Sequence, residues 1–375
     1  MKIAIPAETE GDEPRVAATP DTVKRIAALG GEVVVEKGAG VRAGIPDSDF
    51  TSAGAKIANG SVTKDADVVL KVRRPTKAQL ADYKPGALVI GILDPYGNDA
   101  ALADLAAAKV AAFSMELLPR ITRAQGMDVL SSQANLAGYR AVIDGSAIFG
   151  RALPMMMTAA GTVPAAKVFV MGAGVAGLQA IATARRLGAI VTATDVRPAA
   201  KEQVESLGAK FVAVEDEEFR QAETAAGYAK EMSKEYQAKQ AALVASHIAK
   251  QDIVVTTAAI PGRPSPKLVS KAMVESMKPG SVIVDLAVER GGNCELSKPG
   301  EVVDANGVKI AGYLNVPGRL AATSSSLYAK NLFAFLELLV DKEKKLNVPW
   351  DDEIVKATLL TRDGAVVHPN FQRKA

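Results

Sequence analysis

The stretch KVFVMGAGVAGLQAIATARRLGAIVTATD, residues 167–195, decides the fold of this chain. It begins with an apolar run that is typical of a buried strand, and it continues with Gly172, Gly174 and Gly177 in G-x-G-x-x-G spacing. An alanine-rich helical segment follows, and then a second apolar run that ends at Asp195. The glycine pattern alone is weak evidence, but the surrounding strand, helix and strand predict a dinucleotide-binding βαβ unit.

Each residue of this pattern has a distinct physical role. Gly172 permits a tight turn, Gly174 lets the backbone approach a pyrophosphate, and Gly177 lets the helix pack closely on the strand. The helix N-terminus offers free N–H groups and a positive dipole to phosphate. Asp195 would accept hydrogen bonds from ribose hydroxyls and repel a 2′-phosphate, which favours NAD(H) over NADP(H), although Arg197 weakens that preference. The alternative is a glycine-rich turn without a ligand, in which Asp195 caps a helix.

The strand–helix alternation extends on both sides of this unit. Continuous Val/Ile/Leu/Ala runs indicate strands buried on both faces, as in a parallel sheet covered by helices. The strand candidates before residue 130 are KIAIP, EVVVEKG, DVVLKV, ALVIGIL and VAAFSMEL, and those after residue 165 are KVFVMGAG, IVTATD, KFVAVE, DIVVTTA, SVIVDLA and KIAGY. We therefore predict an α/β protein with two Rossmann-like parallel-sheet domains and a cleft between them.

Helix signals place the joins between the domains. In TPDTVKRIAALGG, Thr19 is the expected N-cap before Pro20, with Val23, Ile26 and Ala27 facing inward. A long helix with Leu136, Tyr139, Ile143 and Ala147 near helical spacing should enter the second domain, and another with Leu327, Leu332, Leu336 and Leu339 should leave it.

The residues after that second long helix are too few for a domain of their own. They include TLLTRDGAVVH, in which Asp363-Gly364 predicts a hairpin turn. We expect this remainder to return to the first domain. The prediction is a discontinuous flavodoxin/Rossmann-like domain of residues 1–130 plus 320–375, and an NAD(H)-binding Rossmann domain of residues 131–319.

Composition excludes several classes of protein. The 375 residues are 48% hydrophobic and 23% charged, which is globular, and a net charge of +3 spread along the chain gives no case for nucleic acid. Cys294 is the single cysteine and is expected to be a buried apolar residue, so neither a disulfide framework nor a thiolate metal site is expected. No apolar run approaches the ~18 residues of a membrane span, and the N-terminal run is too short for a signal peptide, so we expect a soluble chain.

The polar segment RITRAQGMDVLSSQANLAGYR, residues 120–140, contains no His, Cys, Lys or Glu. Together with MMMTAAGTVPAAKVFVMGAGVAG, TDVRPAAKEQVESLGAKF, GYAKEM, MKPGSVIVDLAVERGGNCELS and TRDGAVVHP, it closely resembles the NAD(H)-binding component of the proton-translocating nicotinamide nucleotide transhydrogenases. The resemblance covers essentially the whole chain.

This resemblance implies an activity that needs no acid or base. The family passes a hydride directly from NAD(H) on this component to NADP(H) on a partner component, with Si/Re stereochemistry, and a membrane-spanning component couples the exchange to proton translocation. It implies a chain that is active only with these partners, forms a homodimer and lies on the cytoplasmic face of the inner membrane through them. Such a site must orient two rings and exclude water.

The resemblance also assigns residues to the site. Arg120, Asp128 and Ser131 would hold the nicotinamide carboxamide and neighbouring groups, and Gln125 would reach toward NADP(H). Further contacts with the nucleotide fall on Val175, Val196, Arg197, Gly227, Tyr228, Gln240 and Ala259, of which Tyr228 lies in the family's mobile loop. For the polar segment, the alternative is a solvated loop in which Asp128 or Ser131 caps the following helix.

Two other functions remain open. The first is an alanine dehydrogenase, because Arg15 and Lys71 match positions at which that enzyme binds pyruvate. However, Asp94 stands where its catalytic His is expected and Glu289 where its Asp is expected. His247 and His368 are the only histidines, and both are expected to be surface residues. The second is a binding module that senses NAD(H) without chemistry.

Overall fold

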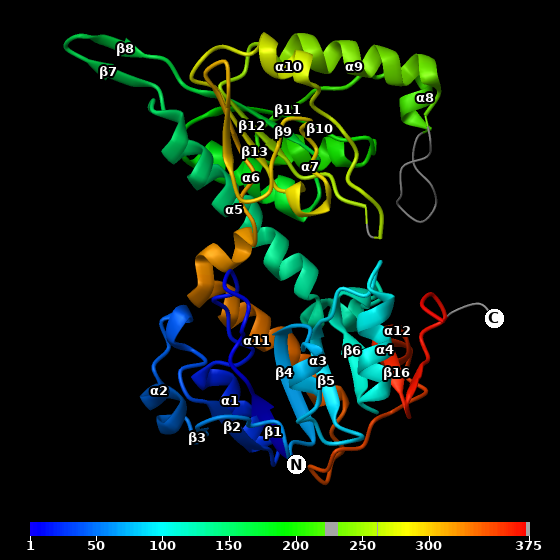
Figure 1. Cartoon of the computed structure of the whole chain (residues 1–375). Coiled ribbons are helices and arrows are strands. Elements are labelled where there is room, and N and C mark those ends of the chain that lie inside the picture. The colour runs from blue at the N-terminus through cyan, green and yellow to red at the C-terminus, as the bar shows by residue number, and fades with distance from the viewer. Residues whose placement is uncertain (222–231, 261, 373–375) are drawn as a thin grey trace. The chain divides into compact units, whose positions relative to one another are not determined.

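The computed structural model describes residues 1–221, 232–260 and 262–372. The chain divides into two compact units, Met1–Gln133 with Pro317–Ala375, and Ala134–Val316. Each unit is built on one mostly parallel sheet with helices packed on it (Figure 1). The predicted α/β class, with two Rossmann-like parallel-sheet domains, is confirmed, and the cleft expected between them stays a prediction.

The sheet of the first unit has the strand order β3-β2-β1-β4-β5-β6-β16-β17. Strands β1 to β6 pair in parallel, whereas β16 pairs antiparallel with β6 and with β17. The strands are β1 (Lys2–Ile5), β2 (Glu32–Glu36), β3 (Lys56–Ala58), β4 (Val68–Arg73), β5 (Leu88–Ile92), β6 (Ala111–Ser114), β16 (Leu359–Arg362) and β17 (Ala365–Val366). The helices are α1 (Pro20–Ala28), α2 (Asp47–Ser52), α3 (Lys77–Leu80), α4 (Asp99–Ala107), α11 (Ala321–Leu338) and α12 (Glu353–Thr358), with 3-10 turns η1 (Val41–Ala43), η2 (Met115–Leu117), η3 (Thr122–Met127) and η5 (Val316–Leu320).

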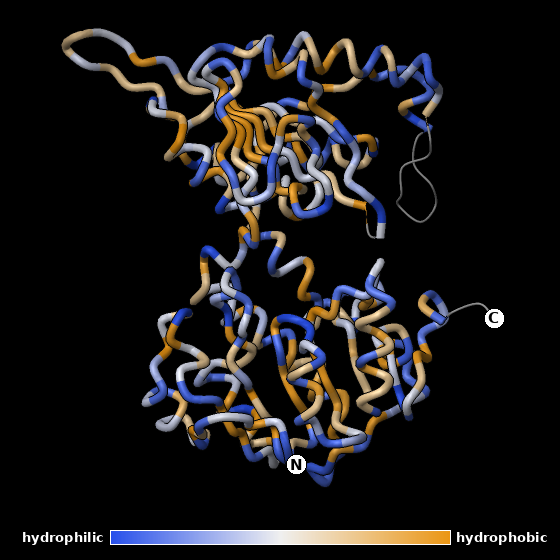
Figure 2. The backbone as a smooth tube through the Cα atoms, viewed as in Figure 1, coloured by the Kyte–Doolittle hydropathy of each residue, from blue (hydrophilic) through white to orange (hydrophobic). Residues whose placement is uncertain are grey.

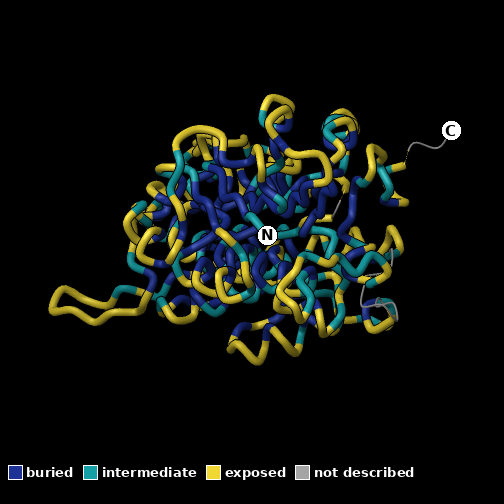
Figure 3. The backbone as a smooth tube through the Cα atoms, turned by 90° about the horizontal axis from the view of Figure 1, so that it is seen from below, coloured by how far each residue is buried: buried dark blue, intermediate teal, exposed yellow. Residues whose placement is uncertain are grey.

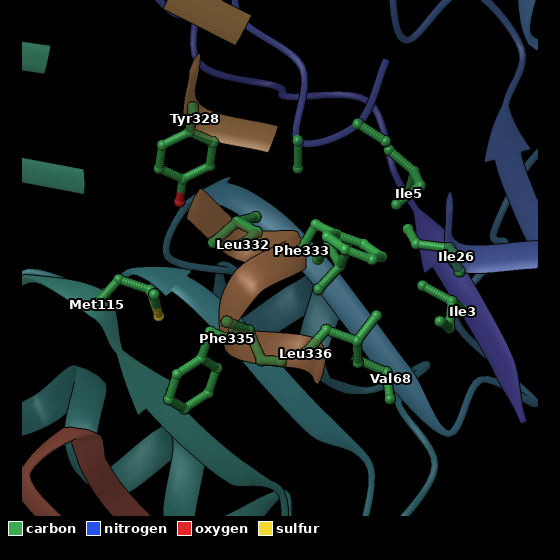
Figure 4. Packing of buried hydrophobic residues seen from close by; sticks show 14 of the residues in the cluster. Ile3, Ile5, Ile26, Val68, Met115, Tyr328, Leu332, Phe333, Phe335 and Leu336 are labelled. Atoms are coloured by element: carbon green, nitrogen blue, oxygen red, sulfur yellow. The ribbon is translucent and has the colours of Figure 1, made fainter. Parts of the chain in front are cut away.

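Alternate residues of these strands enter cores on opposite faces of the sheet. Ile3 and Ile5 pack with α1 and α11, whereas Ala4 packs with α3 and α4 on the other face. Figure 4 shows the first core, in which α11 contributes Leu332, Phe333, Phe335 and Leu336. Burial of both faces explains why the strands are continuously apolar.

Helix α1 begins as predicted but buries a different face. Thr19 is its N-cap and Pro20 its first residue, and the Thr19 hydroxyl accepts a hydrogen bond from the N–H of Thr22. Val23 and Ile26 are buried, but Ala27 is exposed, so the prediction for Ala27 was wrong. Thr22 takes the inward place because its hydroxyl is satisfied within the cap.

The predicted C-terminal hairpin is confirmed. Strands β16 and β17 pair antiparallel, with Thr361 opposite Val366. Asp363 and Gly364 between them have φ angles of 52° and 83°, which is the left-handed pair that a tight two-residue hairpin turn requires.

The sheet of the second unit has the order β11-β10-β9-β12-β13-β15-β14, in which only β14 is antiparallel. The strands are β9 (Lys167–Met171), β10 (Ile190–Thr194), β11 (Lys210–Phe211), β12 (Ile253–Thr256), β13 (Val282–Asp285), β14 (Val302–Ala305) and β15 (Val308–Ala311). The helices are α5 (Val129–Phe149), α6 (Val175–Arg186), α7 (Ala200–Ser206), α8 (Glu217–Arg220), α9 (Lys234–Ile248) and α10 (Lys271–Ser276), with the 3-10 turn η4 (Val288–Arg290). Figure 2 shows the central strands as a hydrophobic block.

The strand order of this unit reverses at β9. The chain moves outward from β9 to β10 and β11, and then returns to the other side of β9 with β12. In open α/β sheets, ligands bind outside the carboxyl ends of the strands at such a switch point. The loops that follow β9, β10 and β12 are therefore the place to look for a site.

Helix α5 also departs from its predicted face. Leu136 is buried, but Tyr139 is 40% exposed and Ala147 is exposed, so the prediction was wrong at these two positions. The buried position is Gly138, where a Cβ would lie 2.0 Å from the carbonyl oxygen of Ala176 in α6. This close helix contact turns Gly138 inward and leaves Tyr139 outside.

A separate two-stranded hairpin extends from the second unit. Its strands β7 (Met156–Thr158) and β8 (Gly161–Val163) pair only with each other. Figure 3 shows this arm in the colour of exposed residues. Met155 and Met157 are 57% and 81% exposed, which is unusual for large apolar side chains.

Candidate functional site

The glycine turn between β9 and α6 can be formed only by glycine at two positions. Gly172 has a φ of 101°, and a Cβ there would lie 2.5 Å from Oγ1 of Thr257. A Cβ on Gly177 would lie 1.8 Å from the carbonyl oxygen of Gly172. These contacts are internal to the turn, so Gly172 and Gly177 allow α6 to begin directly against β9.

Gly174 has a different role from its two neighbours. Its φ of −76° suits any residue, and a Cβ there would meet no described atom within 4 Å. It is the N-cap of α6, and no side chain caps this helix among the described residues. The open face of Gly174 and the uncapped first turn of a 12-residue helix together form the geometry that accepts a phosphate group.

Asp195 follows β10 and lies beside the glycine turn. Its Oδ2 accepts a hydrogen bond from the N–H of Ala173 at 2.7 Å, and its Oδ1 accepts from the N–H of Arg197 at 2.9 Å. The Arg197 guanidinium also pairs with this carboxylate, with Nε 2.9 Å from Oδ1 and Nη2 3.1 Å from Oδ2. Asp195 is thus fixed at the turn, and Arg197 neutralises part of its charge.

The other predicted nucleotide contacts fall into three groups. Val175 and Val196, next to the glycine turn and to Asp195, are 41% and 59% exposed, and Ala259 after β12 is exposed. Gln240 ties α9 to the sheet, since its Oε1 accepts from the N–H of Val214 and its Nε2 donates to Oγ1 of Thr194. Gly227 and Tyr228 lie outside the described residues.

The polar segment predicted as the catalytic loop belongs to the first unit. Arg120 is exposed, and so is Gln125 in the 3-10 turn η3. Asp128 and Ser131 are brought together at the start of α5, where the N–H of Ser131 donates to Oδ1 of Asp128 at 3.0 Å and its hydroxyl donates to Oδ2 at 2.5 Å. The loop and the glycine turn lie in different units.

An ion pair fixes the turn that carries Gln125. Arg123 donates to both carboxylate oxygens of Asp352, at 2.6 and 3.1 Å, and to Glu353 at 3.3 Å. The hydrogen bond from Arg123 lowers the pKa of Asp352 despite some burial. Asp352 is itself the N-cap of α12, so η3 is bound to the end of a helix.

Two buried ion pairs occupy the cations that an alanine dehydrogenase would use. Lys71 is 1% exposed, with its Nζ 3.2 Å from Oε2 of Glu8. Arg15 is 3% exposed, donates to both carboxylate oxygens of Glu13 at 2.7 and 2.6 Å, and reaches Oε1 of Gln133 at 2.8 Å.

The two carboxyl groups of these pairs shift in opposite directions. Burial raises the pKa of Glu8, and the charge of Lys71 only partly offsets it. Burial also raises the pKa of Glu13, but hydrogen bonds and charge from Arg15, with the charge of Arg73, outweigh that effect, so the pKa is lowered.

Neither histidine lies near the glycine turn. His247 is partly buried in α9, where its Nε2 lies 2.8 Å from Oγ1 of Thr192. His368 is buried, not a surface residue as predicted, and its Nε2 lies 3.2 Å from the carbonyl oxygen of Ala357. Cys294 is fully buried, as expected for an apolar role.

Comparison with known proteins assigns the family. Residues 4–137 match the family described as Alanine dehydrogenase/PNT, N-terminal domain, and residues 141–369 match Alanine dehydrogenase/PNT, C-terminal domain. The chain belongs to the alanine dehydrogenase/PNT family. Among the described residues, no helix is long and apolar enough to cross a membrane.

Within the alanine dehydrogenase/PNT family, the chain is similar to transhydrogenases over its whole length. It is 57% identical to the first portion of the split NAD(P) transhydrogenase subunit alpha of Rhodospirillum rubrum, over 98% of each chain. The crystal structure of transhydrogenase from Sinorhizobium meliloti matches with a TM-score of 0.91 and 60% identity, covering 98% of this chain and all of the other. A solved L-alanine dehydrogenase matches with a TM-score of 0.83 and 25% identity, covering 100% of this chain and 98% of the other. The predicted resemblance is confirmed.

Sequence reasoning missed the residues that fix the turn from behind. Thr257 donates its hydroxyl to the carbonyl oxygen of Gly172 at 3.1 Å, and the backbone of Ala173 holds Asp195. Asn293 is fully buried and bonds the backbone of Ala258. The two glycines before Asn293 in ERGGNCELS were the available signal, because they indicate a special turn that presents a polar residue.

Proposed function

We propose that this chain is the NAD(H)-binding component of a proton-translocating transhydrogenase, which passes a hydride from NADH to NADP+ on a partner component. What carries the proposal is the glycine turn with Gly174 open to a ligand, in a chain that is similar over its whole length to transhydrogenase alpha subunits. The partners hold NADP(H) and span the membrane, so the chain is peripheral to the membrane through them.

The glycine turn and Asp195 bind the two ends of the adenosine diphosphate part. The uncapped N–H groups at the start of α6 would receive the pyrophosphate, with Gly174 giving the backbone room to approach it. Asp195 would accept hydrogen bonds from the ribose hydroxyls. The exposed side chains of Val175 and Val196 would pack on the flat apolar faces of the nucleotide.

The polar segment orients the reacting ring. Arg120, Asp128 and Ser131 would hold the carboxamide and neighbouring polar groups, while Gln125 would point to the partner. NADH supplies the hydride, from C4 of its nicotinamide ring. The residues of this chain contribute position and exclusion of water and move no proton, which is why a segment without His, Cys, Lys or Glu suffices.

The homodimer is part of the same proposal. Met155, Met156 and Met157 on the β7–β8 arm are 57%, 40% and 81% exposed, and an exposed apolar arm supports contact with a second copy. Sedimentation of the Met157→Lys variant should show a larger monomer fraction than wild type. A wild-type chain that sediments as a monomer would remove the dimer from the proposal.

The decisive experiment combines the chain with the NADP(H)-binding component and follows cyclic hydride exchange with a coloured NAD analogue. We expect exchange in the mixture and none with either component alone. NADH with pyruvate and ammonium should give no turnover, because Arg15 and Lys71 are already paired with carboxylates. Turnover of pyruvate would favour the alanine dehydrogenase alternative, and NADH binding without either reaction would favour the sensing module.

A further inference from the structure

The turn after η4 delivers one asparagine into the interior of the second unit. Gly291 and Gly292 have φ angles of 94° and 77°, a conformation that side chains rarely adopt. They reverse the chain so that Asn293 points inward with no exposed surface. A buried amide needs hydrogen-bond partners, so its partners identify what it holds.

The side-chain amide of Asn293 is used on the backbone of one neighbouring loop. Its Oδ1 accepts a hydrogen bond from the N–H of Ala258 at 3.0 Å. Its Nδ2 donates to the carbonyl oxygen of Ala258 at 2.8 Å and to that of Pro266 at 2.9 Å. Both donors and one lone pair of the amide are therefore engaged, and both polar groups of Ala258 are held by one side chain.

Ala258 lies directly against the glycine turn. The N–H of Thr257 still continues the sheet by donating to Met171 of β9 at 2.9 Å, and its hydroxyl donates to the carbonyl oxygen of Gly172 at 3.1 Å. The backbone nitrogen of Ala258 would lie 3.5 Å from a Cβ on Gly172. Asn293 thus acts on the glycine turn through a single intervening residue.

A buried carboxylate fixes Asn293 from the other side. Oδ2 of Asp285, at the end of β13, accepts from the N–H of Cys294 at 2.9 Å, and its Oδ1 accepts from the hydroxyl of Thr256 at 3.1 Å. Asp285 is 1% exposed, so these bonds are shielded from water. The carbonyl oxygen of Asn293 also accepts from the N–H of Val269 at 3.0 Å.

We propose that Asn293 is a positioning residue for NAD(H) binding, which holds the segment 257–260 against the glycine turn. This inference rests on the proposed function, because it concerns the same nucleotide site. The segment ends in the exposed residues Ala259 and Ile260, which are placed beside the turn for contact with the nucleotide. Without the amide, both polar groups of Ala258 lose their partner and the segment must shift to reach water.

The test uses the full chain, NADH fluorescence titration and amide hydrogen exchange. Asn293→Ala removes all three hydrogen bonds, whereas Asn293→Asp keeps the size and the acceptor but loses both donors. Val308→Ala is the matched control, because Val308 is 1% exposed in β15 and its truncation lowers stability without touching the segment. We expect both Asn293 variants to bind NADH about tenfold more weakly, as the loss of one net hydrogen bond predicts. Exchange at 257–260 should become faster in both.

The control separates positioning from general stability. Val308→Ala should lower the melting temperature while leaving the dissociation constant for NADH and the exchange at 257–260 unchanged. Asn293 variants with wild-type affinity would overturn the proposal, as would wild-type exchange in the segment, or two variants that do not fold. Failure of the wild-type chain to bind NADH would instead defeat the proposed function, and the exchange measurement would still report whether Asn293 holds the segment.

Discussion

Ser131 gives both of its hydrogen-bond donors to the carboxylate of Asp128. Its N–H lies 3.0 Å from Oδ1 and its hydroxyl 2.5 Å from Oδ2. The N–H of Ser132 donates to the carbonyl oxygen of Asp128, so Asp128 also stands at the N-cap position of α5. Capping and ligand orientation are therefore two possible uses of the same pair, and mutation can separate them.

Truncation of Asp128 should affect stability more than truncation of Ser131. Asp128→Ala removes the capping side chain and should lower the free energy of unfolding by about 1 kcal/mol. Ser131→Ala keeps its backbone hydrogen bond to Asp128 and should change stability less, yet hydride transfer in the reconstituted complex should fall. Thermal unfolding and the cyclic assay measure the two effects. If Ser131→Ala retained full transfer, the pair would be a helix cap and nothing more.

Gly174 and Gly177 should respond to alanine in opposite ways. Gly174→Ala should fold normally, because its added Cβ meets no described atom within 4 Å, but it should weaken NADH binding by occupying the space of the pyrophosphate. Gly177→Ala should unfold at a much lower temperature, because its Cβ would lie 1.8 Å from a carbonyl oxygen. Titration and thermal unfolding of both variants check this. A Gly174→Ala protein with wild-type affinity would contradict a phosphate at this turn.

Asp195 and Arg197 should set the preference between the two nucleotides. Asp195→Ala should weaken NADH binding about tenfold, since hydrogen bonds to a charged group are lost. Arg197→Leu should retain NADH and reject NADPH more strongly, because Asp195 keeps the N–H of Ala173 but loses its guanidinium. Parallel titrations with NADH and NADPH give the ratio. Equal losses for both nucleotides in Arg197→Leu would show that Arg197 binds a group they share.

The buried elements could be predicted from the sequence, whereas the exposed edges could not. Strands such as β9 and β12 are continuous apolar runs, and their burial makes the pattern decisive. The strands β3, β14 and the β7–β8 arm were missed, because they are short, lie at edges and are largely exposed. Their structure depends on a pairing partner and leaves little trace in hydropathy.

The same division applies to the candidate site. Gly172, Gly177 and Asp195 follow from local spacing, because a turn between strand and helix constrains its own residues. Thr257 and Asn293 come from distant parts of the chain and meet the turn only after the sheet has formed. Local sequence carries no information about which side chain will support a loop from behind.

Removal of Glu13 should weaken the fold in a pH-dependent manner. Its carboxylate is fully buried and holds Arg15, so Glu13→Gln leaves a buried cation without its counter-charge and should cost about 3–5 kcal/mol at neutral pH. The pKa of Glu13 is lowered, because Arg15 and Arg73 outweigh the effect of burial. A lowered pKa means that the folded state binds the proton less tightly than the unfolded state does.

The contribution of Glu13 should therefore be complete above its ordinary pKa of 4.5 and disappear as the pH falls through the lowered value. Melting temperatures of wild type and Glu13→Gln should differ most near neutral pH and converge in acid. Glu32→Gln is the matched control, because Glu32 also has a lowered pKa through Lys56 but is exposed, and its loss should leave the melting temperature unchanged. A gap between wild type and Glu13→Gln that stayed constant down to strongly acidic pH would mean that packing, not charge, makes Glu13 important.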